Sequence, residues 1–183
     1  MFLGMVFVVA LSLAAFQAPC TSLALGAYLH GTWTVKKEFS YVRGGKCGTF
    51  DGKATFTYLP GDDSQLSYIE DGTMLLQPER ITLTARRRLL YDCTAKRHVR
   101  VSFDEASSRD PADMLRSARF FHDIWLAEDG APPPPFDHPC GPDMYTGRLL
   151  ISEKDAFALH WRVDGPRKSG MQSLLYTRAT ASI

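Results

Sequence analysis

From Gly31 onward, apolar and polar residues alternate along this chain with a period of two. The stretch from Gly48 to Tyr58 shows the pattern most clearly. One face carries Phe50, Gly52, Ala54, Phe56 and Tyr58, and the other carries Thr49, Asp51, Lys53, Thr55 and Thr57. Because successive side chains of a β-strand point to opposite faces, this pattern predicts a strand with one buried face. A mainly helical chain would need apolar residues three or four positions apart, so the pattern argues against one.

Segments of this kind follow one another and are separated by short turns. They are residues 32–41, 48–58, 66–74, 81–91, 99–103, 120–126, 145–152, 157–163 and 172–178. Short strands joined in consecutive hairpins predict an all-β fold, an antiparallel up-and-down barrel of about 8–10 strands. One short helix is expected at 110–116, where Asp110 can cap a helix that begins with Pro111.

Size and charge limit the class of protein. With 183 residues, 45% of them hydrophobic, the chain can bury the core of one domain. Its formal net charge is only +1, whereas a nucleic-acid-binding domain usually has a clear basic excess, so we expect no nucleic-acid partner. The four cysteines form no Cys-x-x-Cys pair, which argues against structural zinc, and we predict no metal and no cofactor. Four independent buried thiols are the favoured interpretation, while disulfides stay open for an exported chain.

The first 28 residues form a hydrophobic segment of their own, since no Lys, Arg, Asp or Glu precedes Lys36. The apolar run at 1–16 is short for a bilayer span, which needs about 20 residues, and has the length of a secretory signal. A membrane anchor, a signal and an over-extended gene start remain open. We expect this segment at 1–28, the barrel at 29–178 and a tail at 179–183, in a protein that is membrane-associated or exported.

Several short motifs resemble those of a known family. They are Gly31-Thr32-Trp33, the Phe-His pair at 121–122, His-x-Cys-x-x-Asp-x-Tyr at 138–145 and Gly-Pro-Arg-Lys at 165–168. Together they resemble an uncharacterised lipocalin-like (calycin-type) β-barrel domain family of unknown function. The resemblance spans 29–178 and implies a lipocalin-like barrel, but it implies no activity. The chain departs from the family pattern in its hydrophobic N-terminus, in an insertion at 105–117 and at Ser169-Gly170, where an aromatic residue is expected.

Three residues of the last third are candidates for chemistry: His122, His138 and Cys140. A histidine beside a cysteine can act as base to its nucleophile, and together with Asp143 such residues can also bind a metal. A simpler role is favoured for His122. It shares its expected face with Phe120 and other apolar residues, so it belongs to the core.

Charged residues suggest where a ligand could bind. Glu70 is expected to point into the barrel, where a carboxylate needs a cation, and the nearest supply in sequence is Arg86–Arg88. A structural ion pair that plugs one end of the barrel is the favoured role for Glu70. Arg167 and Lys168 follow Gly165-Pro166 in a hairpin turn, and two adjacent cations suit a carboxylate or phosphate group. A solvated turn is the equally favoured alternative.

Topology predicts where these residues meet. Hairpin turns of a meander alternate between the two ends of a barrel, so the connections at 127–144 and 164–171 should share one rim. We predict a ligand site at that rim, with His122 lying deeper. Asp143 and Tyr145 belong to it, although each also suits a local role in setting the turn and capping the barrel. In the alternative, Asp143 pairs with Arg167 and closes the barrel.

These features predict a non-enzymatic barrel that binds a small, anionic or amphipathic molecule. No catalytic motif is recognised, so an enzyme is the less favoured class. Two alternatives stay open. One is an accessory structural subunit of a membrane-associated protein complex, and the other is a small-molecule enzyme that uses His, Cys and Asp at the rim.

Overall fold

The computed structural model describes residues 18–43, 46–127 and 131–180. Its elements in chain order are α1 (Ser22–Leu29), β1 (Gly31–Arg43), β2 (Cys47–Leu59), β3 (Asp62–Gln77), β4 (Ile81–Ala95), β5 (His98–Asp104), α2 (Pro111–Arg116), β6 (Ala118–Trp125), β7 (Phe136–Cys140), β8 (Asp143–Glu153), β9 (Ala156–Asp164) and β10 (Ser169–Arg178). The hydrogen-bonded order is β6-β5-β4-β3-β2-β1-β10-β9-β8-β7, with antiparallel pairing throughout. The predicted all-β, up-and-down architecture is confirmed.

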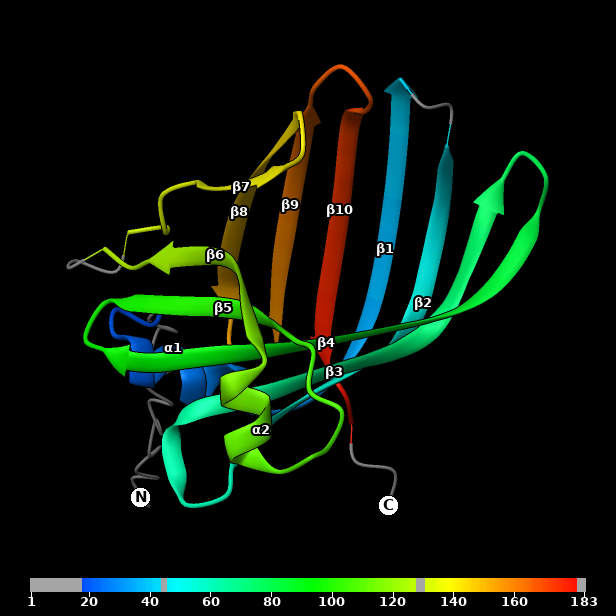
Figure 1. Ribbon diagram of the computed structural model, residues 1–183. Coiled ribbons are helices and arrows are strands. Elements are labelled where there is room, and N and C mark those ends of the chain that lie inside the picture. Colours follow the sequence, from blue (N-terminus) through cyan, green and yellow to red (C-terminus); the bar gives the residue numbers. More distant parts are fainter. Residues whose placement is uncertain (1–17, 44–45, 128–130, 181–183) are drawn as a thin grey trace, which may run out of the picture.

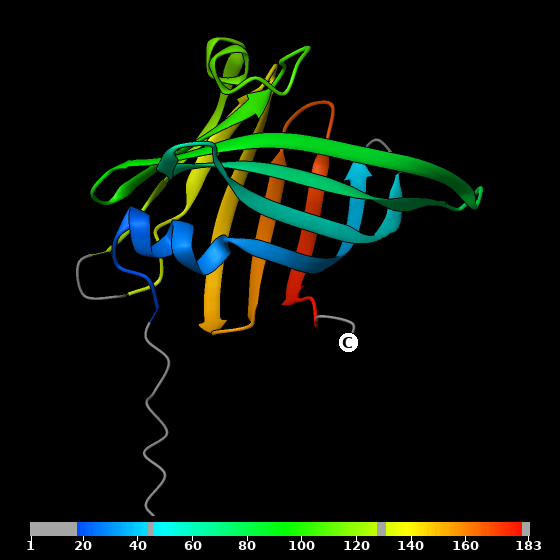
Figure 2. The same cartoon turned by 90° about the horizontal axis from the view of Figure 1, so that it is seen from below.

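The sheet curls until its two end strands meet. In Figure 1, β4 and β5 lie across the view while β9, β10 and β1 stand upright behind them, and Figure 2 shows the same two layers from below. No ladder joins β6 to β7 within the described strands. Instead, Nδ1 of His138 lies 2.8 Å from the carbonyl oxygen of Phe121, and the barrel is nearly closed.

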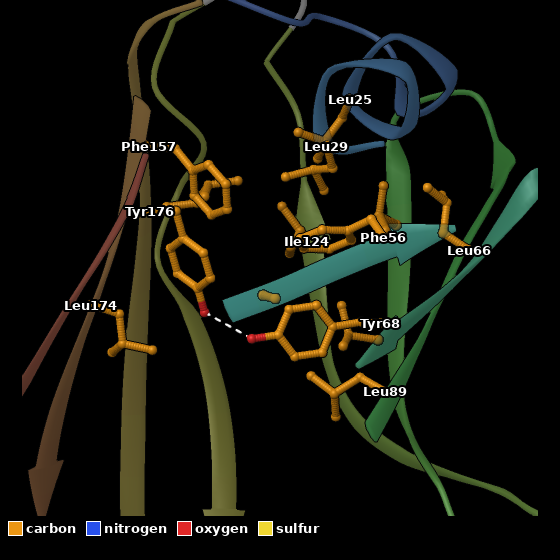
Figure 3. Close-up of a cluster of buried hydrophobic side chains, with 14 of the residues drawn as sticks. Leu25, Leu29, Phe56, Leu66, Tyr68, Leu89, Ile124, Phe157, Leu174 and Tyr176 are labelled. Carbon is orange, nitrogen blue, oxygen red and sulfur yellow. Dashed lines mark hydrogen bonds between the residues drawn. The ribbon is translucent and has the colours of Figure 1, made fainter. Parts of the chain in front are cut away.

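Aromatic and aliphatic side chains from both layers fill the interior. Trp33, Phe50, Phe56 and Tyr68 are each 0–2% exposed, as their period-two positions predict. Figure 3 shows part of this core, with Phe56 and Tyr68 near Leu25 and Leu29 of α1, and the hydroxyls of Tyr68 and Tyr176 are 3.1 Å apart. The core therefore occupies the end of the barrel that α1 covers.

A helix that the sequence analysis did not anticipate covers that end. The hydroxyl of Thr21 accepts a hydrogen bond from the Ala24 amide and caps α1, while Leu25 and Leu29 are buried one helical turn apart. The sequence analysis assigns 22–28 to the hydrophobic N-terminal segment. The stretch is apolar on all sides, so the apolar residues that face the core do not stand out in the sequence. Most of the proposed signal or anchor, residues 1–17, lies outside the described residues. No helix that the structure describes is long and apolar enough to cross a membrane.

The strand β7 was also missed, because the sequence from Phe136 to Cys140 follows four prolines and contains Pro139. Proline removes a donor from a ladder and is tolerated at a sheet edge, which is where β7 lies. The expected short helix is present as α2, capped by the Asp110 side chain, which accepts from the Asp113 amide.

Candidate functional site

The two turns that topology assigned to one rim lie side by side. Oδ1 of Asp143 accepts hydrogen bonds from the backbone amides of Arg167 at 3.0 Å and Lys168 at 3.3 Å. Asp143 is 7% exposed and lies against Gly165, where a Cβ atom would stand 2.2 Å from its Oδ1. The carboxylate therefore organises the β9–β10 turn through its backbone, and the Arg167 side chain stays exposed.

Inward from this rim, polar side chains continue along three strands. Nζ of Lys168 lies 3.4 Å from the Tyr145 hydroxyl on β8 and 5.0 Å from the centre of the Tyr41 ring on β1. The amide of Gln172 on β10 donates to the Tyr41 hydroxyl. Burial raises the pKa of Tyr41, so this hydroxyl remains a neutral donor.

Deeper still, Glu70 forms a buried ion pair with Lys37, and the exposed side-chain fractions are 4% and 11%. The other carboxylate oxygen accepts from the Tyr68 hydroxyl, which in turn contacts Tyr176. The inward direction expected for Glu70 is therefore observed. The partner expected from Arg86–Arg88 is wrong, because Lys37 reaches over from β1.

Arg87 faces the same interior and has no ion-pair partner in the part of the chain that the structure describes. It lies directly opposite Glu70 in the β3–β4 ladder, and cross-strand neighbours share a face. Its charge acts to lower the pKa values of Lys37, Tyr41 and Tyr176, groups on two other strands. Among the described residues no carboxylate lies within ion-pair distance of its exposed guanidinium, whereas Arg86 pairs with Asp71 on the outer face.

We refer to these side chains as the inner polar cluster. Its members are Lys37, Tyr41, Glu70, Arg87, Tyr145 and Lys168. Three of them are cations and one is a carboxylate, so the cluster carries uncompensated positive charge at the end of the barrel opposite α1. Such an arrangement favours an anionic group over a neutral one.

A pH dependence follows from Lys37. Desolvation outweighs the attraction of Glu70 and lowers the pKa of Lys37 from 10.5 to about 8. Between pH 8 and 10 the unfolded chain therefore holds a proton that the folded chain has released, and stability gained through Lys37 rises with pH. We expect the difference in unfolding free energy between wild type and Lys37→Met to grow by about 2 kcal/mol from pH 7.5 to 10. Urea unfolding at both pH values measures this difference. A difference that is the same at pH 7.5 and pH 10 would contradict the lowered pKa of Lys37.

The two histidines lie at the seam between β6 and β7. His122 is 2% exposed and stacks on Phe136 at 4.4 Å, and its Nδ1 has no hydrogen-bond partner among the residues that the structure describes. Burial, with His138 nearby, lowers the pKa of His122 to about 3, so it is a poor proton acceptor near neutral pH. A register shift beside Phe121 buries that residue and leaves Phe120 50% exposed, so Phe120 does not share the His122 face as expected.

The cysteines are not assembled into a reactive group. Cys20, Cys47, Cys93 and Cys140 are all free. The expectation that all four are buried is wrong, because only Cys93 is. Its burial raises the pKa of the thiol to about 12. Cys140, a candidate nucleophile, is exposed at the end of β7. Within the described ranges, no three His, Cys, Asp or Glu side chains are placed to hold a metal.

A groove of about 1130 Å³ lies on the outer face of the barrel, across β8, β9, β10, β1 and β2. Most of its lining side chains point outward, among them Glu38, Arg148, His160 and Ser173. Nδ1 of His160 lies 2.7 Å from the Ser173 hydroxyl. Both are exposed cross-strand neighbours, a pairing typical of a solvated sheet surface. None of the residues proposed from the sequence lines this groove.

Of the proposed residues, the structure brings Tyr145 and Lys168 into contact, whereas Glu70 pairs with Lys37 on the inner face. It assigns Asp143 to the turn, His122 and His138 to the seam, and Cys140 and Arg167 to the surface. The sequence analysis missed Lys37, Tyr41 and Arg87. The sequence did indicate the direction of Lys37 and Tyr41, because they occupy alternate positions of the same strand as the buried Trp33 and Val35 and therefore share their face.

Comparisons with known proteins agree with this fold. The chain matches the family of unknown function DUF6314 over residues 29–178. No curated protein sequence matches it. An S-type phycobiliprotein lyase, CPES from Guillardia theta, is similar in structure with a TM-score of 0.57 at 9% identity, covering 88% of this chain and 94% of that one. The match to a redesigned β-barrel covers 89% of this chain and 99% of that one, with a TM-score of 0.41 at 14% identity.

Proposed function

The chain belongs to the DUF6314 family of unknown function, and on that premise we propose that it is a barrel that binds a small amphipathic anion. The observation that carries the proposal is the inward-facing Arg87, which lies near Lys37 and has no ion-pair partner among the described residues. A guanidinium presents a planar fork of donors that matches a carboxylate, phosphate or sulfonate group. The tyrosines of the cluster add neutral donors, and the aromatic core supplies an apolar surface for the rest of the ligand.

The proposed ligand site lies inward of the rim site that the sequence analysis predicts. The ligand head is placed on Arg87, Lys37 and Lys168, inward from the turn that Asp143 organises. Structural likeness at 9% identity speaks for the fold alone, so the proposal rests on these side chains. The accessory-subunit and enzyme alternatives, and any membrane or exported location, stay hypotheses.

The test is binding of decanoate, an amphipathic carboxylate, measured by displacement of the fluorescent anion 8-anilinonaphthalene-1-sulfonate. Arg87→Met is expected to weaken decanoate binding by about 10- to 100-fold, since a hydrogen bond to a charged group contributes about 1.5–3 kcal/mol. Decanol, which has the same chain without the charge, should displace the fluorescent anion from the wild-type protein only weakly. Arg87→Met should not change the binding of decanol.

Two matched controls separate the inner face from the outer one. Arg86→Met removes the neighbouring arginine from the outer surface, and Arg148→Met removes an exposed arginine from the outer groove. Both variants should bind decanoate like wild type. If Arg148→Met weakens binding and Arg87→Met does not, the anion site is the outer groove and the proposal is wrong.

A further inference from the structure

Lys37 differs from the neighbouring lysine on its own strand. Its side chain is 11% exposed on the inner face, whereas Lys36 is exposed on the outer face. Its Nζ lies 4.5 Å from the centre of the Phe50 ring. Gly52 and Gly72, opposite each other in the β2–β3 ladder, leave room for that ring, since a Cβ at either would stand within 2.7 Å of it. The amine is therefore held between an apolar surface and a carboxylate.

We propose that Lys37 is a nucleophilic amine that forms a Schiff base with an aldehyde or ketone ligand inside the barrel. This inference rests on the proposed function only in that a ligand reaches the inner face. It adds a covalent bond to a site otherwise assigned to ion pairing. A carbonyl compound with an anionic or apolar tail is the chemical class that fits the surrounding residues.

The surroundings of Lys37 supply what the reaction needs. Neutral Nζ attacks the carbonyl carbon, and the proton lost from nitrogen passes to the oxygen, giving a carbinolamine. Glu70, in contact with Nζ, can take a proton from nitrogen and return it to the hydroxyl. That hydroxyl leaves as water, and a carbon–nitrogen double bond forms. The release of one water balances the condensation, and hydrolysis reverses it without any oxidant or reductant.

Charge and burial keep the amine reactive. Glu70 and Tyr68 face it from β3 and Arg87 from β4, and Glu70 is the one hydrogen-bond partner found for Nζ among the described residues. An ammonium with three N–H groups is poorly satisfied there, and the pKa of Lys37 falls to about 8. At pH 7 about a tenth of the side chain is then neutral, against roughly three in ten thousand for an ordinary lysine. Buried lysines of this kind are typical Schiff-base formers.

The test is reductive trapping in the folded wild-type protein. 4-Formylbenzoate, an anionic aldehyde, and benzaldehyde, its neutral counterpart, are each added with sodium cyanoborohydride at pH 7.5, and peptide mass mapping measures the modified fraction at every lysine. We expect Lys37 to be modified at least ten times faster than Lys36. Its rate should level off above pH 8–9, while that of Lys36 keeps rising. In urea-unfolded protein the two lysines should react alike.

The outcomes separate this inference from the anion site. Equal rates at Lys37 and Lys36 in the folded protein overturn the inference, whatever decanoate binding shows. Selective modification of Lys37 by both aldehydes, with decanoate binding unaffected by Arg87→Met, supports the Schiff base and removes the anion site. A purely structural ion pair predicts slow modification of Lys37, because the pair and its burial would then protect the amine.

Discussion

Replacing Glu70 by glutamine is expected to lower the free energy of unfolding by about 3–5 kcal/mol at pH 7. The Glu70 side chain is 4% exposed and provides the counter-charge for Lys37, which would otherwise face the cation Arg87 in a desolvated interior. A buried charge that loses its partner costs far more than an exposed one, because water no longer compensates it. Urea unfolding followed by tryptophan fluorescence measures the loss.

The neighbouring carboxylate provides the control. Asp71 pairs with Arg86 at 3.1 Å on the outer face, where the two side chains are 54% and 62% exposed. Asp71→Asn should cost about 1 kcal/mol or less, since water screens such a pair. The double variant Lys37→Met/Glu70→Gln removes both buried charges and should recover much of the loss. Equal effects of Glu70→Gln and Asp71→Asn would show that water fills the inner cluster and that the pair is not desolvated.

Replacing Trp33 by alanine should also cost about 3–5 kcal/mol, through a cavity at the end that α1 covers. The indole is fully buried, its Nε1 donates to the Leu29 carbonyl at 2.7 Å, and the Arg178 guanidinium lies 3.8 Å from its ring centre. Arg178 also donates to the carbonyls of Tyr28 and His30, so the indole lies where α1 meets β1 and β10. Losing the ring should loosen α1 as well as the barrel.

Trp125 is the matched control, because its side chain is 55% exposed and stacks on His98 at the edge strand β6. Trp125→Ala should cost about 1 kcal/mol or less. Hydrogen exchange adds a local readout, since the amides of α1 should lose protection in Trp33→Ala but keep it in Trp125→Ala. If the two variants unfold at the same urea concentration, Trp33 is not the anchor that its contacts indicate.

The regular strands were predictable because their information is local. Phe50, Ala54 and Phe56 alternate with polar residues, and one face of such a strand must be buried whatever its neighbours are. Turn residues between the strands then determine the meander order. The strand β7 and the helix α1 were not predictable in this way. Proline and a uniformly apolar composition hide the periodic signal, and only packing against β8 and against the barrel end shows what those segments do.

The inner polar cluster was only partly predictable from the sequence. The alternation of side chains along a strand was enough to indicate that Glu70 points inward and that Arg87 faces away from Arg86 and Arg88. It did not determine that Lys37 pairs with Glu70, because those residues are 33 positions and two strands apart, and the curl of the sheet sets their distance. The sequence by itself determined the fold class, the faces of the regular strands and the shared rim of the two turns, since these follow from local periodicity and chain order. Only the tertiary structure decided which cation is paired and which is left unpartnered, since ion pairing depends on distances and desolvation that arise when the sheet closes.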